Sequence, residues 1–151
     1  MRRKEKEVLD RTEIDRIIES ASVCHLGLAK DNVPYVVPLS FGYDGRYLYF
    51  HSALCGRKLD YLASNGRVCF QMETRLALAA PSDQACEWSF AFDSVIGEGT
   101  AEELHEPAEK HHALLQIVQH YGKGHVPPGQ LERVRVFRIL IAGLTAKRSR
   151  P

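Results

Sequence analysis

The amino-acid sequence predicts a mainly β fold of the α+β class, a small antiparallel barrel of about six strands with short helices at its periphery. Two observations predict this class. Short runs with the two-residue period of strands follow one another and are joined by turn residues such as Asp44-Gly45. The helical segments between them do not alternate regularly with the strands, which argues against repeated βαβ units. A chain of 151 residues has about the size of one domain, so we expect residues 1–151 to form a single domain.

The boundaries of the elements follow from periodicity and from capping residues. Helices are expected at residues 12–22, 56–66 and 107–122. The first should have Thr12 as its N-cap, the second should stop at Asn65-Gly66, and Pro107 should open the third. Strands are expected at residues 23–29, 34–41, 46–52, 67–73, 89–104 and 133–147. Residues 74–86 mix alanine with proline and serine, and we expect a loop or a ragged strand there.

Composition and charge exclude several classes of protein. Apolar residues make up 44% of the chain and charged residues 26%, an ordinary globular mixture, and the formal net charge of +1 gives no basic excess for general nucleic-acid binding. No apolar run approaches the length of a membrane span, and no apolar segment follows the charged N-terminus, so a cytoplasmic location is expected. The four cysteines are widely spaced, which predicts reduced thiols and no metal site. Cys24 and Cys69 lie on apolar strands and are expected in the core.

The expected strand at residues 34–41 is apolar on both faces and contains Pro38. Proline has no backbone N–H to donate to a neighbouring strand. One side of this strand should therefore be open or face a ligand.

The segment FHSALCGRKLDYL, residues 50–62, suggests an anion site. A strand ends at His51 and Ser52, and Gly56 then precedes Arg57 and Lys58 in the first turn of a helix. The N-terminus of a helix favours an anion and disfavours cations, so a phosphate near Arg57 and Lys58 would supply the compensating charge. An exposed pair of cations without a partner is the alternative that this spacing leaves open.

Several motifs together resemble one known superfamily. The segment PYVVPLSF, the element H-S-A-x-x-G-R-K at residues 51–58 and S-V-I-G-x-G-x-A at residues 94–101 follow the charged opening MRRKEKE. In this order they resemble the flavin mononucleotide (FMN)-binding split-barrel superfamily that includes pyridoxamine 5′-phosphate oxidase. The likeness is greatest to its nitroimidazole-resistance (Nim-type) branch and runs from Met1 to about Lys147.

The resemblance implies a six-stranded antiparallel split β-barrel that forms a symmetric homodimer, with FMN at the subunit interface. It places the FMN phosphate on Arg57, Lys58 and the hydroxyl of Ser52. It also places the edge of the flavin ring along the second strand, at Val37, Pro38, Leu39 and Ser40. Gln71 could reach the polar edge of the ring, or it could simply be exposed. His51 is the catalytic candidate, either as a donor to the phosphate or as an acid near the substrate; the alternative is a histidine at a strand end that only satisfies a local carbonyl.

The implied function is that of an FMN-dependent oxidoreductase, acting on nitroimidazole-type or other small electrophilic substrates. A flavin- or haem-binding carrier or sensor without turnover is the alternative, and a barrel that has lost its cofactor and only dimerises is a third. The sequence leaves open whether a deazaflavin replaces FMN.

The chain also departs from the oxidase pattern. Val36 stands where the oxidase has an arginine, and the C-terminal Trp and Arg-His element for pyridoxal phosphate is missing, so oxidation of vitamin B6 is not expected. The basic residues Lys147 and Arg148 are expected to form a solvated tail, with a contribution to the cofactor site of the second subunit as the alternative. Cys55 lies within the proposed phosphate loop, either as an incidental small residue or as a thiolate favoured by the helix start.

Overall fold

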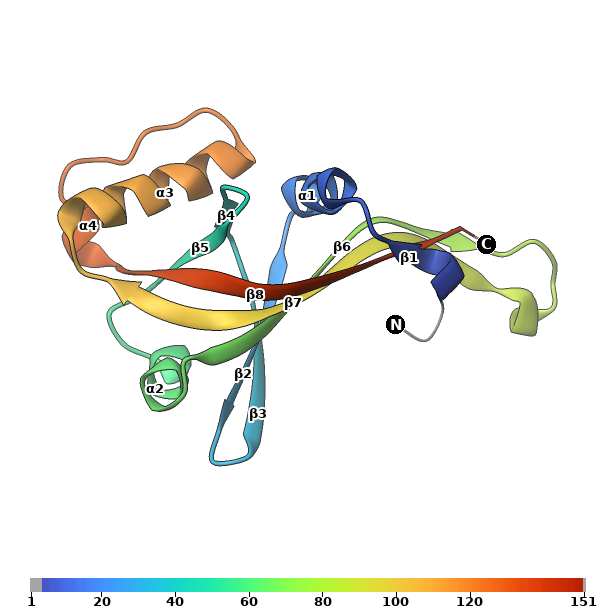
Figure 1. Cartoon of the computed structure of the whole chain (residues 1–151), viewed down its shortest axis with the longest axis horizontal. Helices are drawn as coiled ribbons and strands as arrows, with labels where there is room; N and C mark the ends of the chain where they lie inside the picture. The colour runs from blue at the N-terminus through green and yellow to red at the C-terminus, as the bar shows by residue number, and fades with distance from the viewer. Residues whose placement is uncertain (1–3, 151) are drawn as a thin grey trace.

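The structure is a computed structural model, and it describes residues 4–150 of the chain (Figure 1). Its strands are β1 (Glu7–Val8), β2 (Cys24–Lys30), β3 (Val33–Leu39), β4 (Gly42–Tyr43), β5 (Tyr47–Ser52), β6 (Arg67–Ala79), β7 (Ser89–Leu104) and β8 (Arg135–Ser149). Its α-helices are α1 (Arg11–Ser20), α2 (Arg57–Ser64), α3 (Pro107–Tyr121) and α4 (Gln130–Arg133). Two short 3₁₀ helices, η1 (Lys4–Lys6) and η2 (Ala85–Glu87), complete the described part.

The strands form one antiparallel sheet in the order β3-β2-β6-β7-β8-β5-β4, with β1 paired to β8. This arrangement confirms the predicted mainly β, split-barrel class. The six long strands match the six that the sequence predicts, and β1 and β4 are additional pairings of two residues each. In Figure 1 the long strands β7 and β8 cross the molecule, with α3 and α1 on one side and α2 on the other.

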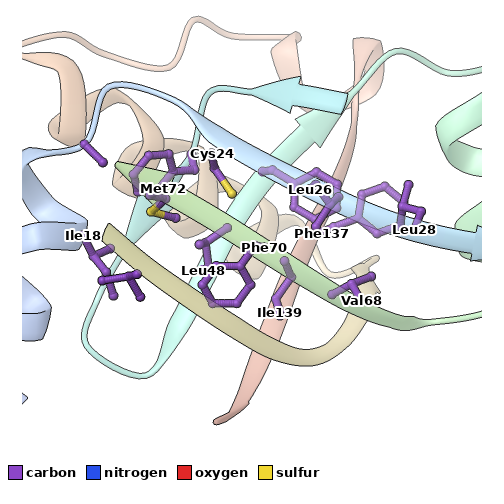
Figure 2. Packing of buried hydrophobic residues seen from close by; sticks show 14 of the residues in the cluster. Ile18, Cys24, Leu26, Leu28, Leu48, Val68, Phe70, Met72, Phe137 and Ile139 are labelled. Carbon is purple, nitrogen blue, oxygen red and sulfur yellow. The ribbon is translucent and has the colours of Figure 1, made fainter. Parts of the chain in front are cut away.

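The core lies between the inward faces of the strands and α1. Cys24, Leu26 and Leu28 alternate along β2 and are buried, as the two-residue period of a strand requires. They pack in one cluster with Phe70 and Met72 of β6, and Figure 2 shows these side chains together with Ile18 of α1. Burial of each such side chain contributes about 1.5–3 kcal/mol, so this cluster fixes which face of every strand points outward.

The predicted start of α1 was two residues late. Asp10, not Thr12, is the N-cap, because its carboxylate accepts hydrogen bonds from the backbone N–H groups of Thr12 at 2.8 Å and Glu13 at 3.4 Å. A carboxylate at this position satisfies two free donors and also complements the positive end of the helix.

The loop or ragged strand expected at residues 74–86 is an irregular strand to Ala79, followed by a loop and the start of η2. β6 continues through Ala79 and pairs with β7 on both sides of an irregularity between Thr74 and Ala77. Two residues of β6, Arg75 and Leu76, stand opposite the single residue Phe92 of β7, which is the geometry of a β-bulge. This long hairpin extends beyond the rest of the sheet in Figure 1.

The expectation of a solvated basic tail was also wrong. β8 extends to Ser149, and Arg148 Nε lies 3.0 Å from Asp93 Oδ1, while its Nη2 lies 3.0 Å from Glu13 Oε2. Asp93 is only 1% exposed, so the end of the chain is held by a buried carboxylate. The basic residues at the C-terminus therefore join β8 to β7 and α1.

Cys24 and Cys69 lie on strands, whereas Cys55 lies in the loop before α2 and Cys86 in η2. All four are free thiols, and Cys24 is buried, which raises the pKa of its thiol to about 12. Cys69 was expected in the core, but it points outward from β6 and is exposed, because the register gives the inward positions to Val68 and Phe70. No helix within residues 4–150 is both long and apolar enough to cross a membrane.

Candidate cofactor site

The start of α2 presents unpaired backbone donors. Gly56 is the N-cap with φ 132° and ψ 165°, a conformation that side-chain-bearing residues rarely adopt. A glycine has no side chain with which to cap a helix, and no other side chain of residues 4–150 caps α2. The first N–H groups of the helix are therefore free to bind a ligand that accepts hydrogen bonds.

The guanidinium of Arg57 lies over two neighbouring tyrosine rings. Its Cζ lies 4.6 Å from the ring centroid of Tyr35 on β3 and 5.3 Å from that of Tyr61, and its Nη2 donates to the Tyr61 hydroxyl at 3.0 Å. The centroids of the two tyrosine rings lie 5.2 Å apart. This contact joins the start of α2 to the strand that the sequence associates with the flavin ring.

Lys58 lies over the end of β5. Its Nζ donates to the backbone carbonyl of His51 at 3.3 Å and lies 5.5 Å from the ring centroid of Phe50. Partial burial lowers the pKa of Lys58. The pKa of His51 is also lowered, mainly by burial of the ring and then by the positive charge of Lys58. Both pKa shifts are in the direction that a nearby anion would oppose.

Neither Arg57 nor Lys58 forms an ion pair with a carboxylate of the described residues; the nine ion pairs there involve other cations. Ser52 lies at the end of β5, is 8% exposed, and its hydroxyl makes no hydrogen bond with residues 4–150. Two unpaired cations, a free hydroxyl and free helix N–H groups are the donors that a phosphate binds. The residues present therefore fit a phosphate group such as that of a flavin nucleotide.

β3 is the edge strand of the sheet and pairs only with β2 among the described strands. This explains how Pro38 is tolerated, since its missing N–H would face the open side. The side chains of Val37 and Leu39 pack against the core, so these two residues offer a ligand their backbone only. Pro38 and Ser40 are exposed, and they offer both backbone and side chain.

A row of paired residues crosses the outward face of the sheet. His25 of β2 pairs with Pro38 of β3 on one side and with Gln71 of β6 on the other. Gln71 in turn pairs with Ile96 of β7. The amide of Gln71 donates to the carboxylate of Glu73, so it already has one partner on its own strand.

The structure thus brings His51, Ser52, Arg57 and Lys58 together at one corner. It places Pro38 of β3 and Gln71 of β6 on either side of His25 of β2.

Sequence reasoning did not identify Tyr35, Tyr61 or His25 as site residues. Tyr61 lies four positions after Arg57 on α2, a spacing that could have indicated contact. The roles of Tyr35 and His25 depend on strand pairing, which the sequence does not show. Among residues 4–150, no three His, Cys, Asp or Glu side chains are placed to hold a metal ion.

Comparison with known proteins identifies the family. The profile of the family described as pyridoxamine 5′-phosphate oxidase matches residues 10–148, which is nearly the whole chain. The chain belongs to this family. A Rhizobium meliloti protein of uncharacterised function, RA0666, is 31% identical over 65 residues, and that alignment spans 43% of this chain and 42% of the relative.

Solved structures of the same fold include three informative relatives. A Bacteroides thetaiotaomicron protein described as a candidate 5-nitroimidazole antibiotic resistance protein has a TM-score of 0.83 and 31% identity, over 93% of this chain and 85% of that one. An FAD-binding protein from Mesorhizobium loti has a TM-score of 0.69 and 26% identity, over 94% and 96%. An FAD- and haem-binding protein from Mycobacterium smegmatis has a TM-score of 0.83, over 97% and 74%, and at 19% identity it supports the fold alone.

Proposed function

We propose that the protein is an FMN-dependent oxidoreductase that reduces a small electrophile, such as a nitroimidazole-type compound. One observation carries the proposal. Arg57 and Lys58 follow Gly56 at the start of α2, and neither has a carboxylate partner in the described part of the chain, although Lys58 is partly buried. A phosphate monoester carries a charge of about −1.5 to −2 at pH 7 and would supply the missing counter-charge.

The residues of the chain would bind and orient the cofactor. Arg57 would donate to the phosphate from the face of Tyr35, which restricts its rotamers before binding. Lys58, the Ser52 hydroxyl and the first N–H groups of α2 would complete the phosphate contacts. The open edge of β3 at Pro38 would lie along the ring, and FMN, when bound, supplies the electron-transfer chemistry.

Two roles fit His51. Its backbone carbonyl accepts from Lys58, so the residue lies next to the proposed phosphate site. Its imidazole can donate an N–H to the phosphate whether it is neutral or protonated. In the second role His51 holds a proton for transfer to the reduced substrate.

The direct test uses the purified protein and FMN. FMN is titrated into the protein and binding is followed by quenching of flavin fluorescence. The complex is then reduced without oxygen and mixed with a nitroimidazole. Faster reoxidation than that of free reduced FMN supports the proposed enzyme. Binding without acceleration would favour a carrier, a haem band near 400 nm would favour a haem protein, and absence of FMN binding would refute the assignment.

A homodimer is part of the same proposal. The outward face of the sheet exposes large apolar side chains beside the row that contains Pro38, with Val36 63% and Ile96 56% exposed. Exposed apolar residues grouped on one sheet face are typical of an interface. We propose that a second copy of the chain covers this face and completes the wall of the flavin site.

The oligomeric state tests this part separately. Ile96→Glu should convert a dimer to a monomer in light scattering after gel filtration and should weaken FMN binding. Leu9→Glu adds the same charge at a residue that is 81% exposed and lies outside this face, and it should leave the dimer intact. A wild-type monomer that binds FMN would refute the proposed shared site.

A further inference from the structure

A surface cavity of about 560 Å³ lies next to the proposed flavin strand. It is formed where the chain between α1 and β2 approaches Pro38 of β3 and the bulge of β6, and its wall includes His25, Glu73, Arg75 and Leu76. Cavities of about 300–1,000 Å³ are the usual size of sites for small molecules. Because Pro38 belongs both to this wall and to the strand proposed for the flavin ring, a molecule in the cavity would lie beside the ring.

The same wall contains one residue with a strained backbone. Arg75 has φ 56°, in the left-handed region that residues other than glycine seldom occupy, and it is one of the two bulge residues that oppose Phe92. The bulge turns the side chain of Arg75 away from the regular alternation of β6. Bulges and strained residues of this kind are frequent at binding sites, where they direct a side chain.

Arg75 has hydrogen-bonding capacity that the described protein does not use. Its nearest carboxylate is that of Asp93, with Nη1 to Oδ2 at 3.7 Å, and the Arg75 side chain is 69% exposed. Asp93 is already bound more closely by Arg148 at 3.0 Å and Arg150 at 2.7 Å. Three guanidinium groups therefore share this one carboxylate, and Arg75 is the most weakly bound of them. Its planar N–H donors remain available to an anion in the cavity.

His25 supplies a second polar group to the wall. Its Nδ1 is enclosed and has no hydrogen-bond partner within residues 4–150. An enclosed N–H without an acceptor is costly, which favours the tautomer with the proton on Nε2. The ring could then donate from Nε2 to an acceptor bound in the cavity. Together, Arg75 and His25 provide two donors from adjoining parts of one wall.

The rest of the wall limits the class of ligand. Glu73 adds a negative charge, which opposes a ligand with two or more negative charges. Pro38 and Leu76 provide apolar surface for the body of a small molecule. A planar carboxylate matches a guanidinium in a bidentate geometry. We propose that this cavity binds a small monocarboxylate, with Arg75 pairing the carboxylate and His25 donating to it.

This inference rests on the proposed function in one respect: it makes the substrate beside the flavin a small electrophile that carries one carboxylate. The binding site itself does not depend on FMN, and it can be tested on protein prepared without flavin. The probes are benzoate and its neutral analogue benzamide, which share a ring and differ in charge. Binding is measured by NMR titration of the backbone amide signals.

Benzoate should bind at least about tenfold more tightly than benzamide, since a charge-assisted pair adds at least one hydrogen bond to a charged group. The shifted signals should cluster at His25 and at Thr74 to Leu76. Arg75→Gln should remove the preference for benzoate, whereas Arg133→Gln, at an exposed arginine of α4, should preserve it. His25→Leu should weaken benzoate binding by about tenfold, the loss of one hydrogen bond to the charged carboxylate.

Three results would overturn the proposal. They are an equal affinity of wild-type protein for benzoate and benzamide, a preference that persists in Arg75→Gln, and signal shifts centred on Arg57 and Lys58 instead of the cavity. If Arg75→Gln does not fold, the NMR shifts of the wild-type protein decide whether benzoate binds in the cavity.

FMN affinity should be the same in Arg75→Gln and in wild type. If the wild-type protein failed to bind FMN, the proposed function would be refuted, while the proposed binding of a carboxylate in the cavity would stand or fall on the benzoate titration.

Discussion

The guanidinium of Arg57 lies over the ring of Tyr35, with its Cζ 4.6 Å from the ring centroid. The two residues are 22 positions apart in the chain and belong to α2 and β3. Their contact joins the phosphate corner to the strand proposed for the flavin ring. It restricts a flexible, exposed side chain before any ligand arrives, and restriction of this kind reduces the entropy lost on binding.

Tyr35 should therefore affect FMN affinity without touching the phosphate. Tyr35→Leu removes a cation–π contact worth about 0.5–1 kcal/mol at an exposed site and should weaken FMN binding about two- to fivefold. Tyr35→Phe keeps the ring and should bind FMN like wild type. Fluorescence titration checks both. Equal affinity in all three proteins would mean that the stacked position of Arg57 plays no part in binding.

Bound FMN should raise the pKa of His51. In the free protein this pKa lies below the ordinary value of 6.5, because burial and then the charge of Lys58 disfavour the imidazolium. A phosphate anion nearby favours the charged form, so the midpoint should move upward when FMN binds. NMR titration of the His51 ring signals measures this midpoint. An unchanged or lower midpoint would place the phosphate away from His51.

Gly56 should be required for both stability and binding. Its φ of 132° and ψ of 165° belong to a region used almost only by glycine, so Gly56→Ala should cost about 1–3 kcal/mol in the free energy of unfolding. Open space surrounds the position, and the cost would therefore come from the backbone. Urea denaturation measures the loss, and a shifted helix start should also weaken FMN binding.

Gly129→Ala is the matched control for this change. Gly129 also has a positive φ, 79°, with open space around it, but it lies at the start of α4. It should lose stability and retain FMN affinity. If Gly56→Ala also retained full FMN affinity, the backbone at the start of α2 would not contact the phosphate.

The buried carboxylate of Asp93 should stabilise the C-terminal end of β8. It accepts from Arg148 at 3.0 Å and Arg150 at 2.7 Å, while being 1% exposed. Asp93→Ala should lower the free energy of unfolding by about 2–4 kcal/mol, because hydrogen bonds to charged groups are lost and three arginines are left without their shared partner. Asp83→Ala, at an exposed residue before η2, should change it little. A similarly small change in the free energy of unfolding for Asp93→Ala and Asp83→Ala would show that the C-terminal tail is solvated, as the sequence suggested.

The sequence predicted the parts of this structure that local patterns determine. Alternation in β2, β5 and β7 reflects which side chains face the core, and Pro38 marked the open edge strand correctly. The start of α2 was also predicted, since glycine followed by a polar first turn is a local signal. The N-cap of α1 was misplaced because Asp10 and Thr12 are both good capping residues and only the structure shows which one accepts the hydrogen bonds.

The remaining features depend on strand register and on contacts between distant segments. The row from Pro38 through His25 to Gln71 exists only because three strands pair in one particular register. The bulge at Arg75 inserts one extra residue, so the alternation of β6 breaks and the segment resembles a loop in the sequence. The partner of Arg148 is a residue 55 positions away, which no local pattern indicates.

The central claim is that Arg57 and Lys58 bind a phosphate, and the most direct test compares FMN with riboflavin, which lacks only that group. Wild-type protein should bind FMN at least about 100-fold more tightly than riboflavin, as two charge-assisted contacts predict. Arg57→Ala with Lys58→Ala should bring the two affinities within a few fold, while Arg46→Ala, which removes an arginine stacked on Tyr47, should leave the difference unchanged. A double variant that still preferred FMN by 100-fold would contradict the phosphate assignment.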